Sequence, residues 1–277
     1  MSPDEYCQQK AARSGSSFYY SFLFLPPERR RAITALYAFC REVDDTVDEC
    51  QDPGVAATRL AWWRHELAAM SAGQAQHPVT QALHQASASF NLPEEQLREI
   101  IDGMEMDLQQ TRYLDFRALS LYCYRVASVV GLLAAEIFGY QDRRTQKYAH
   151  DLGIACQLTN IIRDVGEDAR RGRIYLPIDE LQRFGVPASD ILEARHSDAF
   201  RRLIEFQIDR AESYYAQALA TLPAADRKAQ RPGLVMAAIY RTLLDEIRRD
   251  GCQVLTQRTS LPPLRKLWIA WRTWVRG

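Results

Sequence analysis

The sequence has no excess of charge of either sign. Its 35 lysines and arginines balance 35 aspartates and glutamates, so the formal net charge is zero. Domains that bind nucleic acids usually carry a basic surface, and a long acidic tail would shift the balance the other way. We therefore expect no nucleic-acid partner, and any strongly charged site must be local.

Cysteine and histidine are scarce and are not spaced for metal binding. The six cysteines form no C-x-x-C pair, and the five histidines show no H-x-x-x-H spacing. Such pairs are typical of zinc sites, and closely set cysteines are typical of secreted, disulfide-bonded domains. Their absence argues against both classes and favours a reducing, cytoplasmic location.

Long apolar runs and low-complexity segments are also missing. The longest nearly uninterrupted apolar stretches, residues 18–26 and 126–135, are shorter than the roughly 20 residues of a membrane-spanning helix. The first residues lack the basic-then-apolar order of a signal peptide. Thirteen glycines and twelve prolines form no linker and no repeat. We expect one domain over 1–277, in the cytoplasm or peripheral on the inner face of a membrane.

Helical periodicity, by contrast, is abundant. Between residues 32 and 47 the apolar side chains recur in steps of three and four, at Ile33, Leu36, Tyr37, Cys40, Val43 and Val47. Segments between proline and glycine breaks run about 12 to 25 residues, which is helix length. Residues 126–137 and much of 148–162 are apolar on more than one face, as are helices at the centre of a bundle. The fold is predicted to be an all-α helical bundle.

The first group of residues suited to chemistry is YAFCREVDDTVDE, residues 37–49. On a helix, Asp44 and Asp48 share one face, with their Cβ atoms about 6 Å apart. Tyr37 and Arg41 lie on the same stripe. Because two carboxylates at this spacing repel each other, the pattern favours a cation between them.

The second group is QLTNIIRDVGEDARRGRIYLP, residues 157–177. Asn160, Asp164 and Asp168 recur every four residues and project together if the helix continues past Gly166. Gln157 joins them one turn earlier. All these candidate ligands are oxygen atoms, which suit Mg²⁺ and also Mn²⁺.

Two such faces, opposed across a bundle, would hold several Mg²⁺ ions. These ions would bind a diphosphate that Arg41 and Arg163 help to neutralise, and the apolar central helices would surround a hydrocarbon tail. The sequence therefore predicts a substrate with a diphosphate head and a long apolar tail.

Simpler interpretations exist for each of these features. A single D-x-x-x-D helix face is most often solvated surface, and Tyr122 and Tyr240 are by default core tyrosines. The basic run at residues 170–173 could be a solvated turn. The two acidic groups lie among apolar neighbours, however, which makes plain surface exposure less favourable.

The same residues resemble those of a known family. The two groups are similar to the aspartate-rich motifs of squalene and phytoene synthases: D-D-x-x-D after Y-x-x-x-R, then Q-x-x-N-x-x-R-D-x-x-x-D followed by R-I-Y-L-P. SGSSFYYSFLFLP resembles the family's serine-rich segment, LYCYRVASVVG its Y-C-x-x-V-A-x-x-V-G helix, and MAAIYRTLLDEIRRDG a late helix. The resemblance extends from about Ser14 to Arg265.

The resemblance implies an isoprenoid synthase fold with a central apolar cavity, and specific roles for individual residues. It implies that Mg²⁺ is bound by Asp44, Asp48, Asn160, Asp164 and Asp168. It implies that prenyl diphosphates are bound by Ser14, Ser16, Ser17, Tyr37, Arg41, Gln157, Arg163 and Tyr240. In catalysis, Arg41 and Arg163 would stabilise the departing diphosphate, and either Tyr122 or the released diphosphate would handle a proton.

Within the family, the motifs are most similar to those of bacterial presqualene diphosphate synthases of the hopanoid route to squalene. The predicted reaction is head-to-head condensation of two farnesyl diphosphates to presqualene diphosphate, with release of diphosphate. NADPH is not expected, because no G-x-G-x-x-G segment follows a strand. The alternatives are a phytoene or dehydrosqualene synthase, a full NADPH-dependent squalene synthase, an all-α Mg²⁺-dependent nucleotide pyrophosphatase and a non-catalytic helical scaffold.

The C-terminal segment 261–277, LPPLRKLWIAWRTWVRG, is apolar, basic and free of acids. A helix here would form one stripe from Leu264, Leu267, Trp268, Trp271, Trp274 and Val275. Two interpretations stand side by side: a last helix that packs on the bundle, or a helix that lies on an anionic membrane surface. The sequence does not specify an oligomeric state.

Overall fold

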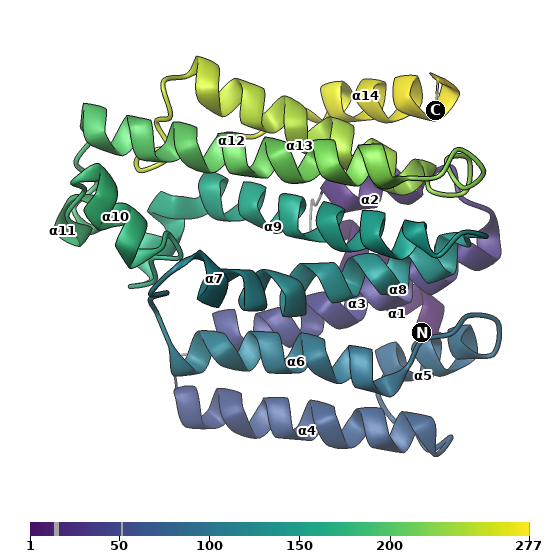
Figure 1. Cartoon of the computed structure of the whole chain (residues 1–277). Helices are drawn as coiled ribbons and strands as arrows, with labels where there is room; N and C mark the ends of the chain where they lie inside the picture. Colours follow the sequence, from purple (N-terminus) through teal and green to yellow (C-terminus); the bar gives the residue numbers. More distant parts are fainter. Residues whose placement is uncertain (14–16, 51, 277) are drawn as a thin grey trace.

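The computed structural model describes residues 1–13, 17–50 and 52–276, and within them every regular element is a helix (Figure 1). Extended segments in these ranges meet only at an isolated bridge between Arg112 and Ile174. The prediction of an all-α bundle is therefore confirmed.

The helices follow one another with short connections. In chain order they are α1 (Pro3–Arg13), α2 (Ser17–Phe22), α3 (Pro27–Asp48), α4 (Pro53–Ser71), α5 (Pro78–Ser87), α6 (Glu94–Gln109), α7 (Phe116–Cys123), the π-helical turn η1 (Tyr124–Ser128), α8 (Val129–Phe138), α9 (Arg144–Arg170), α10 (Ile178–Phe184), α11 (Ala188–Leu192), α12 (Asp198–Thr221), α13 (Arg231–Arg249) and α14 (Pro263–Arg276).

Most of the long helices lie side by side. In Figure 1 α4 and α6 form one side of the bundle, α3, α8 and α9 its middle, and α12, α13 and α14 the other side. The apolar core has two clusters, and α8 supplies both of them: Ala135 belongs to one, and Val129 and Leu133 to the other. The prediction that residues 126–137 form a central helix is confirmed.

The segment α7–η1–α8, Phe116–Phe138, runs as a nearly continuous helix. Among the described residues it is the one helix long and apolar enough to cross a membrane by length and composition, and a core helix of a soluble protein passes the same test. Its length is not apparent from uninterrupted apolar runs in the sequence, because polar residues break the run. It packs against α3, α6 and α9 (Figure 1), which is the position of a core helix.

Helix α9 continues past Gly166 to Arg170, as the second acidic group requires. The N–H of Gly166 donates to the carbonyl oxygen of Val254 at 3.1 Å. A Cβ atom on Gly166 would come within 2.1 Å of the Leu255 carbonyl oxygen. Glycine at this position therefore allows the segment after α13 to lie directly on α9.

Gly153 allows a second close approach, where α9 meets η1. A Cβ atom built on Gly153 would lie 2.5 Å from the Cα of Ser128 and 2.7 Å from the carbonyl oxygen of Ala127. Both atoms belong to the backbone, which cannot move aside by a rotamer change. This contact fixes the spacing between two central helices.

We predict that Gly153→Ala lowers the free energy of unfolding by about 1–3 kcal/mol, because overpacking against backbone forces the helices apart. The measurement is urea denaturation followed by circular dichroism. The matched control is Gly54→Ala in the first turn of α4, where the nearest atom is a side-chain oxygen of Asp52 at 3.2 Å. The two variants having equal stability would contradict the prediction.

Candidate active site

A cavity of about 610 Å³ lies between α3, η1–α8, α9 and α13. The cavity wall is polar at one end, near the C-terminal ends of α3 and α9. It is apolar at the other end, near the C-terminal end of α8 and the N-terminal ends of α9 and α13. Along α9, the 16 residues from Tyr148 to Asp164 separate the two ends by about 24 Å. The apolar part of the wall includes Val126, Val130, Ala134, Phe138, Leu152 and Met236. The expected central apolar cavity is thus present, with one strongly charged end.

The predicted site residues come together in this one cavity. Those that line it are Tyr37, Arg41, Asp44, Asp48, Tyr122, Gln157, Asn160, Arg163, Asp164, Asp168 and Tyr240. Ser14 and Ser16 lie outside the described residues. Ser17 begins α2, and its neighbours Phe18 and Ser21 line the cavity.

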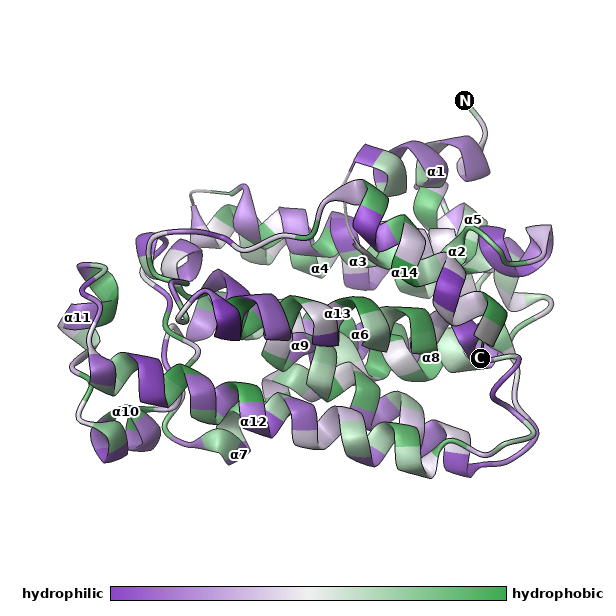
Figure 2. Cartoon of the chain, turned by 90° about the horizontal axis from the view of Figure 1, so that it is seen from above, coloured by the Kyte–Doolittle hydropathy of each residue, from purple (hydrophilic) through white to green (hydrophobic). Residues whose placement is uncertain are grey.

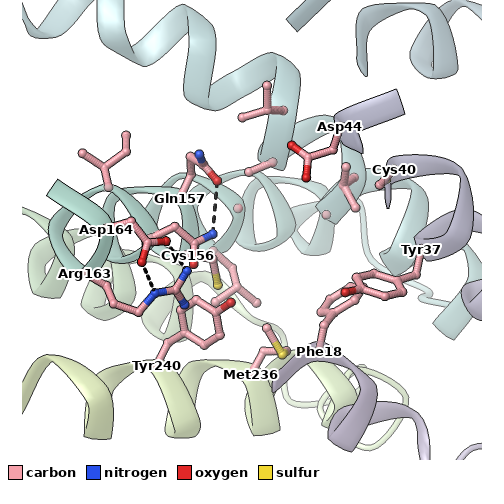
Figure 3. A pocket seen from close by; sticks show the side chains of 18 of the residues that line it. Phe18, Tyr37, Cys40, Asp44, Cys156, Gln157, Arg163, Asp164, Met236 and Tyr240 are labelled. Carbon is pink, nitrogen blue, oxygen red and sulfur yellow. Dashed lines mark hydrogen bonds and ion pairs between the residues drawn. The ribbon is translucent and has the colours of Figure 1, made fainter. Parts of the chain in front are cut away.

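Helix α3 forms one wall of the cavity. Tyr37, Cys40 and Asp44 come from this helix and lie across the cavity from α9 (Figure 3). Arg41 binds Asp44 at 2.6 Å and Asp45 at 2.5 Å. Since Asp45 also binds Lys10 of α1 at 2.8 Å and is absent from the described cavity wall, its neighbour Asp44 is the carboxylate that faces the cavity.

Helix α9 forms the opposite wall. Arg163 donates from Nε to Asp164 at 2.8 Å, and Arg258, from the segment after α13, donates to the same carboxylate oxygen at 2.7 Å. Burial would raise the pKa of Asp164, but these two guanidinium groups lower it below its ordinary value. Tyr240 of α13 lies beside Arg163 (Figure 3). Asp164 is therefore held ionised in a basic environment.

The loop after α9 connects the two walls. Arg171 binds Asp48 of α3 at 2.6 Å, and Arg173 binds the second oxygen of the same carboxylate at 2.9 Å. The Arg173 side chain is only 15% exposed. The basic run at residues 170–173 is thus more than a solvated turn, because two of its arginines neutralise a predicted metal ligand.

Not all the negative charge at this end is neutralised. Burial raises the pKa of Asp44 to about 6, and Arg41 offsets this only in part. Burial and repulsion from Asp164 and Asp107 raise the pKa of Asp168 to about 7. The carboxylates also lie in the C-terminal parts of two helices, where the helix dipole is negative. Additional positive charge would stabilise their ionised forms.

Asp107 on α6 is a site residue that the motifs did not reveal. It accepts hydrogen bonds from the hydroxyl groups of Tyr122 at 2.9 Å and Tyr175 at 2.8 Å. Burial raises the pKa of Asp107 to about 6, although Arg173 acts in the opposite direction. A sequence signal existed: Asp107 follows Ile100 and Met104 on the buried face of α6, where an acid is unusual.

The oxygen-rich donor set fits Mg²⁺. In the described part of the chain, no three His, Cys, Asp or Glu side chains already converge on one point. The Oδ1 atom of Asn160, however, is buried in the cavity wall without a hydrogen-bond partner. Mg²⁺ commonly takes one or two carboxylates from the protein and completes its shell with water and phosphate oxygens. Ligands divided between α3 and α9 are compatible with that mode of binding.

Comparisons with known proteins support the resemblance in the motifs. The family model for squalene/phytoene synthase matches residues 11–265. The chain is 37% identical to a 15-cis-phytoene synthase of Synechocystis sp., over 99% of this chain and 85% of that protein. It is also 37% identical to a phytoene synthase of Arthrospira platensis, over 95% and 89%.

Solved structures of similar fold support the same family. A dehydrosqualene synthase in complex with a ligand superimposes with a TM-score of 0.87 at 28% identity, covering 98% of this chain and 95% of that one. The squalene synthase HpnC from Alicyclobacillus acidocaldarius gives a TM-score of 0.80 at 31% identity, covering 90% and 94%. The chain therefore belongs to the squalene/phytoene synthase family, whose members condense two prenyl diphosphates head to head and use divalent metal ions.

Proposed function

We propose that this chain condenses two molecules of geranylgeranyl diphosphate (C20) head to head and forms phytoene. The observation that carries the reaction type is the cavity, which has arginines and carboxylates at one end and an apolar wall along the rest of its length. The phytoene synthases at 37% identity support the product. They favour this alternative over the presqualene diphosphate product that the motif wording suggested.

The charged end would bind the diphosphate groups. Asp44, Asp48, Asn160, Asp164 and Asp168 are the proposed ligands of Mg²⁺, which would supply positive charge toward the leaving diphosphate. The arginines now paired with these carboxylates would then exchange partners. Arg41, Arg163 and Arg173 have the bidentate geometry that phosphate oxygens favour, with Tyr37, Gln157 and Tyr240 as further substrate contacts.

The apolar part of the cavity protects the reacting carbons. Loss of diphosphate leaves an allylic cation, which water would quench to an alcohol, so a dry wall favours attack by the second prenyl chain. Loss of a proton then closes a cyclopropane that keeps the second diphosphate, and phytoene forms when this diphosphate also leaves, the ring opens and a second proton is lost. We assign removal of the ring-forming proton to the Tyr122 hydroxyl oxygen, which would pass its own proton to the Asp107 carboxylate, its hydrogen-bond acceptor at 2.9 Å.

A second candidate is the same condensation with farnesyl diphosphate (C15). It is favoured by the two solved structures, named as a dehydrosqualene synthase and a squalene synthase, which align over 90% or more of this chain. Its product would be presqualene diphosphate or dehydrosqualene. Neither candidate uses NADPH. Membership of the family removes the support for the pyrophosphatase and scaffold alternatives.

Product analysis distinguishes the two candidates. We expect purified protein with Mg²⁺ to convert the C20 diphosphate to phytoene with a higher kcat/KM than it shows for the C15 diphosphate, and NADPH to change neither the rate nor the product. The products are identified by mass spectrometry. A higher kcat/KM with the C15 substrate would transfer the assignment to the second candidate, and no condensation product from either would overturn the proposal.

The metal ligands can be tested by removing one charge at a time. We predict that Asp48→Asn or Asp164→Asn lowers turnover by at least about 100-fold. Replacing a residue that only orients a metal ligand costs up to about 100-fold, and loss of a ligand itself should cost at least as much. Turnover is measured against Mg²⁺ concentration, with circular dichroism to monitor folding. Asp102→Asn is the control, because this carboxylate binds Arg64 outside the described cavity wall and should keep wild-type activity. Near-normal turnover in either site variant would contradict the ligand assignment.

The proton role of Tyr122 predicts uncoupled chemistry. Tyr122→Phe should slow product formation by roughly 10²- to 10⁴-fold, while diphosphate release continues and a prenyl alcohol appears. Both products are followed in the same assay. Tyr113→Phe is the matched control, since this ring is buried 5.7 Å from that of Tyr122. If Tyr122→Phe keeps its product yield, Tyr122 is a core residue only.

A further inference from the structure

Helix α14 presents two apolar faces, and the bundle covers one of them. Ile269 and Ala270 are buried. On the same face, Trp274 packs against Phe24 with ring centroids 5.3 Å apart, and Lys266 reaches the wall of the reaction cavity. The interpretation of α14 as a helix that packs on the bundle is therefore correct for this face, which is already buried.

The second face is exposed. Its side chains are between 41% and 81% exposed and follow helical spacing along one stripe: Leu264, Leu267, Trp268, Trp271 and Val275. The other large exposed apolar side chains of the described residues form no comparable stripe: Val55 and Trp62 lie two turns apart on α4, Phe24 adjoins α14 through Trp274, and Met1, Leu114, Leu121 and Leu192 lie apart from one another. A contiguous exposed apolar stripe marks an interaction surface, whereas isolated exposed residues do not.

A basic groove borders this stripe, between α13 and α14. It encloses about 580 Å³, and its described wall contains four arginines and no acid. Arg241 binds Glu212 and Arg265 binds Glu246, whereas Arg272 lies over the ring of Trp268 at 5.1 Å. Arg227 completes the set. Figure 2 looks onto this side of the molecule, where α12, α13 and α14 lie together.

The combination of tryptophan, leucine and arginine decides between partners. A second copy of the chain, related by two-fold symmetry, would place the arginines of one groove near those of the other, which is unfavourable. The headgroup region of an anionic bilayer instead accepts tryptophan rings, buries leucine side chains and offers phosphates to arginine. The surface is therefore complementary to anionic lipid.

We propose that the exposed stripe of α14 and the adjoining arginine groove dock this protein on an anionic phospholipid bilayer. Trp268 and Trp271 insert at headgroup level, and Arg227 and Arg272 bind lipid phosphates. The inner face of the same helix contributes Lys266 to the reaction cavity, so docking brings the cavity wall close to the membrane. The proposal does not depend on which prenyl diphosphate the protein uses.

Vesicle flotation of the full-length protein tests this. We expect binding to vesicles of phosphatidylcholine with phosphatidylglycerol and much weaker binding to phosphatidylcholine alone. The double variant Trp268→Gln, Trp271→Gln should lower the partition coefficient about tenfold or more. The double variant Arg227→Gln, Arg272→Gln should lower binding to the anionic vesicles on the order of tenfold, and added salt should reproduce its effect.

The matched control is Trp62→Gln. This tryptophan is 44% exposed and belongs to α4, on the opposite side of the bundle (Figure 1), so its replacement should leave vesicle binding unchanged. Circular dichroism monitors folding, and Leu264→Gln with Leu267→Gln serves if the tryptophan variant unfolds. The proposal is overturned if the full-length protein does not bind anionic vesicles. It is also overturned if the Trp62 variant binds them as weakly as the stripe variants do. A wild-type dimer that only the stripe variants convert to monomer overturns it as well, because the stripe would then bind a second copy.

Discussion

Repulsion among buried carboxylates at one end of an apolar cavity is the constraint on which this structure depends. Asp44, Asp107 and Asp168 all have raised pKa values there because burial removes water from around their charges. Such a cluster is tolerated only when cations are close. Arginines of α3 and α9, together with those of the segments after α9 and after α13, meet part of that need. They also link helices that are far apart in sequence.

The cavity combines two environments because its helices pass through both. Helix α9 is buried and apolar near Tyr148 and carries carboxylates sixteen residues later, at Asp164. Close backbone contact at Gly153 sets the distance between α9 and the η1 turn, and thus the width of the apolar part. One helix therefore contributes to both the charged end and the apolar part of the cavity wall.

Most of the fold and of the cavity lining was predictable from local sequence. The contacts that were not predictable join residues far apart in the chain. Within each motif the spacing of Asp44 and Asp48, and of Asn160 and Asp164, depends only on helical geometry, and the structure brings both motifs to the wall of one cavity. Arg258 could not be found in the same way, because it reaches Asp164 across 94 residues of chain. Asp107 and Tyr175 likewise meet only through folding: the bridge between Arg112 and Ile174 aligns the loops that follow α6 and α9.

The attachment of the segment after α13 to α9, through Gly166 and Val254, has a consequence for synthesis of the protein. Chains emerge from the ribosome N-terminus first, so both acidic helices are complete long before Arg258 appears. Until then, Asp164 lacks one of the two arginines that hold its charge. The nascent bundle therefore carries an acidic centre whose charge is only partly compensated, and the pairing of Asp164 with Arg258 is among the last events of its maturation.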